Sequence, residues 1–308
     1  MTSVLVTGAG GYIGQRITRR LAEDGVAVRA LVRTPVPWPD GVEELVGDLV
    51  LDPDLAKEAS IGVDTVVHLA GANEVAAAED PAGSTAATVL AAERIAAAGT
   101  TRIIYLSTIH VYGASLREGA VISEASAVAP AHPYAAARLA CEQAFARSGV
   151  PTLIFRLTNG VGAPARPDVQ RWSLVANELC RQGATTGQLT LRTSGVQWRD
   201  FVALADVEAI VQSLVEPAAF RPGICNLGSG HSVTVRDLAH LIQDSFEGHG
   251  QPRPELHAPE PPAERPGSYR IDVSRLATLG MTAATPLRTA IDETVQFCLR
   301  HADDLSSH

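Results

Sequence analysis

A glycine-rich turn stands between a strand-like and a helix-like segment at the start of the chain. Residues 3–8 read SVLVTG, an apolar run, and residues 12–25 read YIGQRITRRLAEDG, which has helical character and ends in glycine. The glycines that frame the turn are Gly8, Gly11 and Gly14. Their spacing allows a tight turn, close approach of a pyrophosphate to the backbone, and close packing of helix on strand. The turn therefore predicts a dinucleotide site at the start of a βαβ array.

Strand-like and helix-like segments continue to alternate through the first half of the chain. The expected strands are 27–33, 43–48, 64–71, 102–108 and 152–159, and the expected helices are about 51–60, about 84–98 and one that includes 132–143. Continuous apolar strands that alternate with helices are typical of a parallel sheet covered on both faces. The sequence therefore predicts an α/β fold, a Rossmann-type doubly wound parallel sheet.

The second half of the chain is less regular, and a proline-rich segment near 249–267 predicts an ordered connection or flap. We expect a smaller, mixed substrate-binding domain toward the C-terminus. The expected division gives 1–155 and 196–255 to the NAD(P)-binding domain, and 156–195 and 256–308 to the substrate-binding domain.

Charge and cysteine usage limit the partners of the protein. The formal net charge of −9 argues against nucleic acid and against an anionic membrane surface. The cysteines are far apart and show no metal-ligand spacing, which predicts free thiols in a reducing cytoplasm and no metal site. We find no signal-peptide pattern and no apolar run long enough to span a bilayer. The net charge does not exclude a small anionic substrate, because a local arginine cluster can act inside an acidic protein.

Several short motifs follow one another in a recognisable order. They are TGAGGYIG at 7–14, GDL at 47–49, VVHLAG at 66–71, LSTIHVYG at 106–113, PYAAAR at 133–138, and then RLTNGVG, QWRDF, NLGSG and ERPG. In this order the chain resembles the extended short-chain dehydrogenase/reductases, the NAD-dependent epimerase/dehydratase family, which acts largely on nucleotide sugars. The resemblance covers nearly the whole length.

The resemblance implies a set of residues that bind a nicotinamide cofactor. They are Gly8, Gly11, Tyr12, Ile13, Gly14, Asp48, Leu49, Leu69, Ala70, Gly71, Tyr134 and Arg138. At the end of the second expected strand, Arg33 stands where an NAD-selective site usually has an acidic residue. An arginine suits a ribose 2′-phosphate, which favours NADP(H), while NAD(H) stays possible. A solvated arginine at a strand end is the alternative interpretation.

The resemblance also implies the residues that carry the chemistry. Tyr134 would be the general acid or base and Thr108 would hydrogen-bond the same substrate oxygen, with Ser107 as a weaker candidate. Arg138 stands where the family has a lysine that holds the nicotinamide ribose. An arginine keeps the charge but does not release a proton, so it cannot copy a lysine-based relay. An active enzyme, a slow enzyme and a cofactor-binding protein without turnover are therefore all open.

Three further residues are implied to hold a nucleotide diphosphate: Asn159, Arg199 and Arg265. The alternatives are an ion pair of Arg199 with Asp200 or a nearby carboxylate, and simple solvent exposure for Arg265. Dehydratases of the family usually follow the catalytic threonine with two carboxylates, but this chain has Ile109 and His110, which argues against dehydration.

Two reactions remain open at the end of the sequence analysis. A 4-ketoreductase that consumes NADPH is slightly favoured, and an NAD-dependent nucleotide-sugar epimerase is the alternative. A homodimer that packs through the tyrosine helix is also expected from the resemblance.

Overall fold

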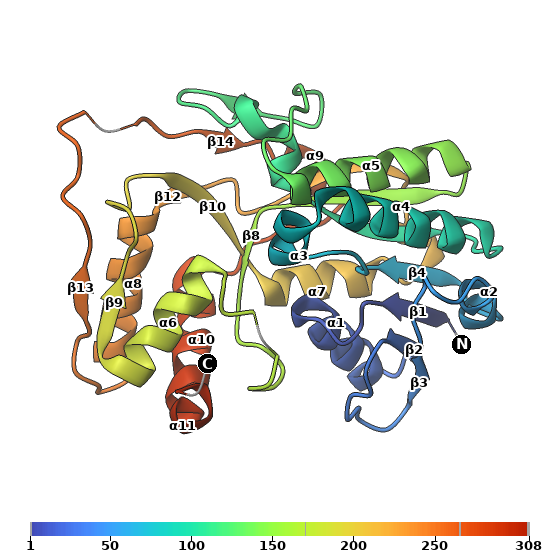
Figure 1. The fold of residues 1–308 in the computed structure, drawn as a ribbon, viewed down its shortest axis with the longest axis horizontal. Helices are drawn as coiled ribbons and strands as arrows, with labels where there is room; N and C mark the ends of the chain where they lie inside the picture. The colour runs from blue at the N-terminus through green and yellow to red at the C-terminus, as the bar shows by residue number, and fades with distance from the viewer. Residues whose placement is uncertain (1, 170, 265, 307–308) are drawn as a thin grey trace.

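A large parallel sheet forms the centre of the Rossmann-type part of the fold (Figure 1). The computed structural model describes residues 2–169, 171–264 and 266–306. Within these ranges, seven strands lie in the order β11-β7-β5-β4-β1-β2-β3 and every neighbouring pair is parallel. The strands are β1 (Ser3–Thr7), β2 (Ala27–Val32), β3 (Val42–Val46), β4 (Thr65–His68), β5 (Ile103–Thr108), β7 (Thr152–Leu157) and β11 (Gly223–Leu227). The predicted doubly wound, Rossmann-type sheet is confirmed.

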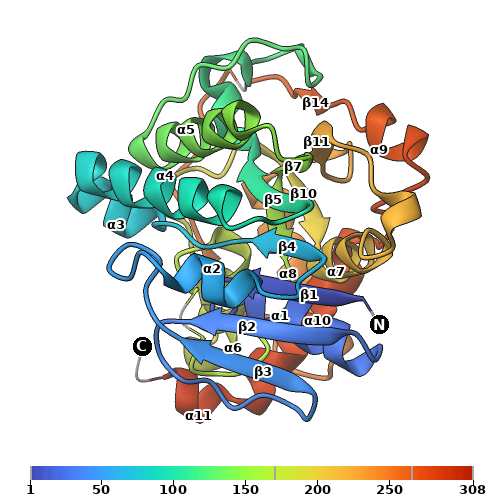
Figure 2. The same cartoon turned by 90° about the vertical axis from the view of Figure 1, so that its right-hand side faces the viewer.

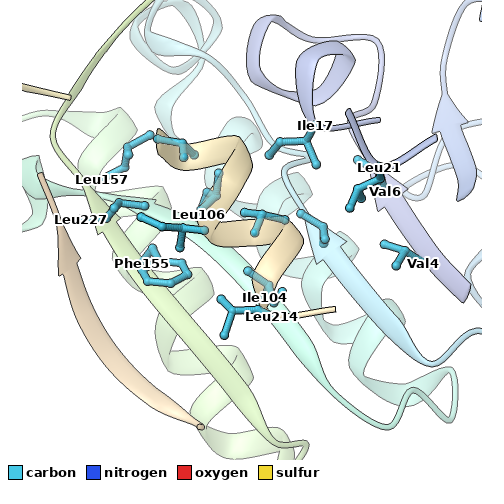
Figure 3. Packing of buried hydrophobic residues seen from close by; sticks show 14 of the residues in the cluster. Val4, Val6, Ile17, Leu21, Ile104, Leu106, Phe155, Leu157, Leu214 and Leu227 are labelled. Atoms are coloured by element: carbon cyan, nitrogen blue, oxygen red, sulfur yellow. The ribbon is translucent and has the colours of Figure 1, made fainter. Parts of the chain in front are cut away.

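Helices cover both faces of this sheet (Figure 2). One face carries α1 (Tyr12–Glu23) and α7 (Leu204–Ser213), and the other carries α2 (Leu55–Ser60), α4 (Pro81–Ala97) and α5 (Pro133–Ser148). Figure 3 shows the core on the α7 face, where strand residues such as Phe155 and Leu227 belong to the same buried cluster as Leu214, which directly follows α7. Burying each such side chain stabilises the fold by roughly 1.5–3 kcal/mol.

The strand order fixes where a ligand can bind. The chain reverses direction across the sheet at β1, which lies between β2 and β4. In a doubly wound sheet, ligands bind outside the carboxyl ends of the strands at this switch point. The last residues of β1 and β4, Thr7 and His68, are register partners, and Thr108 at the end of β5 pairs with Leu157. These strand ends form the floor of the candidate site.

The remaining elements build a second layer beside the sheet (Figure 1). Its helices are α6 (Val175–Thr186), α8 (Val235–Gly248), α10 (Leu287–Arg300) and α11 (Ala302–Leu305). Its strands are β8 (Asn159–Val161), β10 (Trp198–Ala203) and β12 (Ser232–Thr234), with β9 (Gln188–Thr190) paired to β13 (Glu255–His257). Helix α8, expected in the NAD(P)-binding domain, packs on α6 and α10 instead. The division into two domains stays a proposal.

Strand β5 ends at Thr108, as expected from the sequence, and a 3₁₀ turn, η1 (Ile109–Ser115), follows it within the motif LSTIHVYG. The Thr108 side chain accepts the N–H of His110 and ends the strand. Helix α4 begins three residues before position 84, because Asp80 caps it and Pro81 suits a first turn. The other short elements are α3 (Glu74–Glu79), β6 (Val121–Ile122), η2 (Pro217–Ala219), β14 (Arg270–Ile271) and α9 (Ser274–Thr278).

Crossing a membrane requires a helix that is both long and apolar. In the described ranges, none of the helices meets both requirements.

Candidate active site

The glycine-rich turn leaves an open anion site at the start of α1. Gly8 has a φ of +66°, and a Cβ there would lie 2.8 Å from the Ala70 nitrogen. A Cβ at Gly14 would lie 2.9 Å from the Ala9 Cα, so the helix sits close against the strand. Helix α1 begins without a side-chain cap and without an acidic residue in its first turn. The first amide N–H groups of the helix are therefore available to a pyrophosphate, which fits the predicted cofactor.

The Tyr12 side chain makes its contacts within the protein. Its hydroxyl donates to the backbone oxygen of Gly162 and lies 3.3 Å from Asn177 Oδ1. The ring is buried, and this burial raises the pKa of the phenol. Tyr12 thus anchors α1 to the segment after β8, and only its backbone N–H remains for a cofactor.

The expected adenine-side residues lie beyond the ends of β2 and β3. Arg33 follows β2 and is exposed, and no hydrogen bond or ion pair of its side chain is found within the described ranges. The Asp48 carboxylate accepts the Val50 N–H at 2.7 Å, and the Leu49 oxygen accepts from Arg94 at 2.6 Å. Among these three residues, Arg33 therefore has the side chain that is available to bind a ribose 2′-phosphate.

Arg138 is the most unusual charge of the site. It lies on the second turn of α5, and only 8% of the residue is exposed. Its Nε and Nη1 atoms are buried and have no hydrogen-bond partner among the described residues. Buried charged donors are costly unless an acceptor satisfies them. The hydroxyl oxygens of a nicotinamide ribose are acceptors of the required kind, so the guanidinium fits the cofactor that the sequence predicts.

Tyr134 and Thr108 lie at the same edge of the sheet as Arg138. Thr108 is 6% exposed, and since its oxygen accepts a backbone N–H at 3.3 Å, its own proton is free to be donated. Tyr134 is in the first turn of α5, which packs on β5 and η1. The Arg138 guanidinium carbon lies 5.2 Å from the centre of the Tyr134 ring, and His132 stacks on that ring at 6.1 Å. The sequence analysis missed His132, although its place directly before Pro133 marks it as the N-cap of this helix.

The Ser107 side chain takes part in a buried polar network with α5 and β7. Its hydroxyl donates to Glu142 of α5, and Glu142 forms an ion pair with Arg156 of β7 at 2.8 Å. Successive side chains of a strand point to opposite faces, so Ser107 and Thr108 cannot share one role. The Ser107 hydroxyl thus holds α5 against the sheet, and its expected contact with a substrate stays a prediction.

The residues expected to bind a diphosphate differ in how far their polar groups are already hydrogen-bonded within the protein. Arg199 donates to the Trp198 backbone oxygen at 2.9 Å and has no carboxylate partner in the described part of the chain. Asp200 is buried and accepts from Ser229 instead, so the alternative of an Arg199–Asp200 ion pair is wrong. Asn159 donates one amide N–H to the Asp200 backbone oxygen at 2.8 Å, which leaves its second N–H and its carbonyl oxygen for a ligand. Arg265 lies outside the described residues.

Two histidines, the buried His68 and the half-buried His110, lie at the carboxyl ends of β4 and β5. His68 lies beside Thr7, with 2.9 Å between Nδ1 and the Thr7 hydroxyl oxygen, and burial followed by the charge of Arg138 lowers its pKa to about 3. The His110 ring lies 5.4 Å from that of His132. Burial, followed by His132 and Arg199, lowers the pKa of His110 to about 4. Both histidines are therefore neutral at neutral pH.

These two histidines should make the fold sensitive to acid. An unfolded histidine has a pKa of about 6.5, so between that value and about 4 the unfolded chain binds more protons than the folded protein. The free energy of unfolding should then fall with decreasing pH, by up to ~1.4 kcal/mol per pH unit for each histidine. Urea unfolding of His110→Asn between pH 7 and pH 5 should show a shallower slope than the parent protein. The matched control is the exposed His249→Asn, and equal slopes for His110→Asn and the parent would contradict the assignment.

A metal site would require several His, Cys, Asp or Glu side chains close together. Across the described ranges, no group of three or more His, Cys, Asp or Glu side chains is arranged to hold a metal ion.

The fold and the site together define a Rossmann-type protein, with a glycine-rich turn at the switch point of the sheet, Thr108 at the end of β5, and Tyr134 and Arg138 on α5. A model of the NAD dependent epimerase/dehydratase family matches residues 4–228. The chain belongs to this family, as its motifs predicted.

Relatives with established names cover most of both chains. UDP-glucose 4-epimerase of Streptomyces lividans is 26% identical over 286 residues, 83% of this chain and 83% of its own. GDP-6-deoxy-D-mannose reductase of Pseudomonas aeruginosa is 28% identical over 255 residues, 78% of this chain and 79% of its own.

Solved structures show the same architecture. MoeE5 in complex with UDP-glucose and NAD superposes with a TM-score of 0.79 at 27% identity, covering 97% of this chain and 99% of that one. UDP-glucose 4-epimerase of Thermus thermophilus in complex with NAD gives 0.79 at 25% identity, over 96% and 99% of the two chains.

Proposed function

We propose that the protein is an NAD(P)-dependent oxidoreductase that acts on a nucleotide-linked sugar, as a 4-ketoreductase that uses NADPH. The observation that carries the proposal is the buried Arg138 guanidinium, whose Nε and Nη1 lack partners among the described residues and which lies beside Tyr134. A site that keeps such a charge at the switch point of a dinucleotide-binding sheet is suited to a polar cofactor.

Each site residue then has a chemical role. A bound nicotinamide supplies the hydride. The N–H groups at the start of α1 hold the pyrophosphate, and Arg33 holds the 2′-phosphate. Tyr134 donates the proton to the sugar oxygen, Thr108 orients that oxygen by a hydrogen bond, and Arg138 keeps a fixed positive charge next to the phenol. Because Arg138 does not release a proton, Tyr134 must regain its own proton by another route.

The nucleotide part of the substrate is assigned to Arg199. Its guanidinium is half-buried and has no carboxylate to compete with a phosphate in the described part of the chain. A planar guanidinium suits phosphate oxygens through paired hydrogen bonds. MoeE5 was solved with UDP-glucose, and a uridine diphosphate handle is the form of substrate that we propose to test first.

Replacing Arg199 should affect substrate binding more than chemistry. We expect Arg199→Gln to raise KM for the nucleotide sugar roughly 10- to 100-fold, because a charge-assisted hydrogen bond to an anion contributes about 1.5–3 kcal/mol. The value of kcat should change less than KM. Arg192→Gln is the matched control, since Arg192 is an exposed arginine on the same segment. Steady-state kinetics of both variants would refute the role of Arg199 if their KM values were equal.

An epimerase is the second candidate, and it is favoured by the relatives. UDP-glucose 4-epimerases of Streptomyces lividans and Thermus thermophilus resemble this chain over most of its length. An epimerase would keep NAD(H) bound between turnovers, whereas a ketoreductase releases it. A homodimer through α4 and α5, which pack side by side on one face of the sheet (Figure 1), is compatible with either activity and belongs to the proposal.

One experiment separates these candidates. The purified protein is denatured and its nicotinamide content measured, and the empty protein is then titrated with NADPH and with NADH. Little retained cofactor with tighter binding of NADPH supports the ketoreductase, and tightly retained NAD(H) supports the epimerase. Binding of NADPH without turnover of any 4-keto or 4-hydroxy nucleotide sugar supports a non-catalytic binding protein. Failure to bind any nicotinamide overturns all three.

A further inference from the structure

Gly71, directly after the turn that ends β4, is in close contact with Arg138. A Cβ placed on Gly71 would lie 3.1 Å from Arg138 Nη1 and 3.3 Å from its Cζ. It would also lie 3.1 Å from Thr88 Cγ2 of α4. Favourable separations between carbon atoms are about 3.5–4.0 Å, so even one methyl group at this position would push against the guanidinium.

The conformation of Gly71 reinforces this steric requirement. Its φ is +149°, a region that favours glycine over residues with a side chain. The Arg138 guanidinium is flanked by Gly71 and by the Tyr134 ring, whose centre lies 5.2 Å from Cζ. The Tyr105 hydroxyl lies 3.4 Å from the Arg138 backbone oxygen, at the other end of the same residue. The side chain therefore has little room to move away from an added methyl group.

A lysine at position 138 would interact differently with Gly71. Lysine ends in a single nitrogen at the place where arginine has Cζ, and it has no equivalent of Nη1. The contact between the position 71 Cβ and Nη1 would therefore be absent. The flexible lysine side chain could shift to relieve the remaining contact at the position of Cζ. A side chain at position 71 is therefore a problem mainly for an arginine at 138.

We infer that Gly71 is the positioning residue that allows an arginine to serve at position 138. By lacking a Cβ, it leaves room for the planar guanidinium and sets the direction in which Nε and Nη1 point. The inference rests on the proposed function, because the acceptor for these two donors is taken to be the nicotinamide cofactor. Gly71 and Arg138 act as a pair, and the properties of either residue depend on the other.

A double-mutant cycle tests the pairing. The four proteins are the parent, Gly71→Ala, Arg138→Lys and the double variant, and the measurements are the Kd for NADPH and kcat. We expect Gly71→Ala to weaken NADPH binding at least about tenfold in the parent background, and by less than about threefold in the Arg138→Lys background. Backbone strain at position 71 and the contact with Thr88 are common to both backgrounds and cancel in the cycle. Equal factors in the two backgrounds would overturn the inference.

Control proteins separate this coupling from general destabilisation. Gly99→Ala also places a side chain at a positive φ, +83°, but no atom lies within 4 Å of its Cβ, so its Kd for NADPH should match the parent. If Gly71→Ala fails to fold in the parent background, the inference requires the double variant to fold, and failure of both to fold overturns it. Failure of the proposed function is seen differently, as a parent protein that binds no nicotinamide.

Discussion

Replacing Tyr134 by phenylalanine is expected to lower kcat roughly 10²- to 10⁴-fold, the usual contribution of a positioned acid–base group. The change removes one hydroxyl and leaves the ring that lies beside the Arg138 guanidinium and the His132 ring. The Kd for the nicotinamide cofactor should therefore stay within about threefold of the parent value, since the donors of Arg138 and of the α1 terminus are unchanged. Steady-state turnover and a cofactor titration measure the two quantities.

Tyr105→Phe is the matched control for this prediction. Tyr105 is fully buried on β5. Its hydroxyl lies 3.4 Å from the Arg138 backbone oxygen and also interacts with the side chains of Arg138 and Cys141. The kcat of this variant should stay within about tenfold of the parent, because a fully buried hydroxyl cannot give a proton to the substrate. A Tyr134→Phe protein that turns over as fast as Tyr105→Phe would remove Tyr134 from the mechanism.

Replacing Arg138 by methionine should change stability and activity in opposite directions. The substitution removes buried donors that have no partner among the described residues, so the cofactor-free protein should gain about 1–3 kcal/mol in its free energy of unfolding. It also removes the charge next to Tyr134, so kcat should fall at least about 100-fold. Urea unfolding without cofactor and steady-state turnover check the two effects.

Arg102 offers a control of equal burial. It is 8% exposed, as Arg138 is, but its guanidinium donates to the Thr65 hydroxyl at 2.5 Å and to the Val215 backbone oxygen at 2.6 Å. Arg102→Met leaves these acceptors without a donor and should destabilise the protein by about 1–3 kcal/mol. If the two substitutions destabilised the protein alike, Arg138 would be an ordinary structural arginine.

Local rules predicted the parallel sheet and the geometry of the glycine-rich turn well. The glycines at 8 and 14 are needed where backbones approach closely, and this requirement can be recognised from spacing alone. Continuous apolar runs predicted a parallel sheet. A strand that is buried on both faces has apolar residues at successive positions, not an alternation of apolar and polar ones. The position of Tyr134 followed from the order of the motifs along the chain.

Side-chain partners could not be predicted in the same way. Ser107 and Thr108 are neighbours in the sequence, but strand geometry sends Ser107 to Glu142 and leaves Thr108 at the site edge. The Tyr12 hydroxyl binds Gly162, which is 150 residues away in the sequence. The freedom of Arg199 depends on Asp200 being held by Ser229, a contact made only in the folded chain. Such choices between partners depend on tertiary packing.

The substitution of arginine for the family's lysine has a physical explanation in the fold. Sequence alone left three interpretations of Arg138, because the charge is kept and the ability to release a proton is lost. In the structure, the guanidinium occupies a space that Gly71 leaves open, and it lies against the Tyr134 ring. The buried Nε and Nη1 of Arg138 have no partner among the described residues and could each donate to a bound cofactor. This supports the proposal of an active site adapted to arginine.

The most direct test of this account is a titration of NADPH into the parent protein and into Arg138→Met, followed by calorimetry. The account predicts that the parent binds and that the variant binds at least about tenfold more weakly, because the buried donors Nε and Nη1 are lost. Thermal unfolding of the same samples should show a large cofactor-dependent stabilisation for the parent and a small one for the variant. Equal affinities of the two proteins, or no binding by the parent, would contradict the claim that Arg138 holds the cofactor.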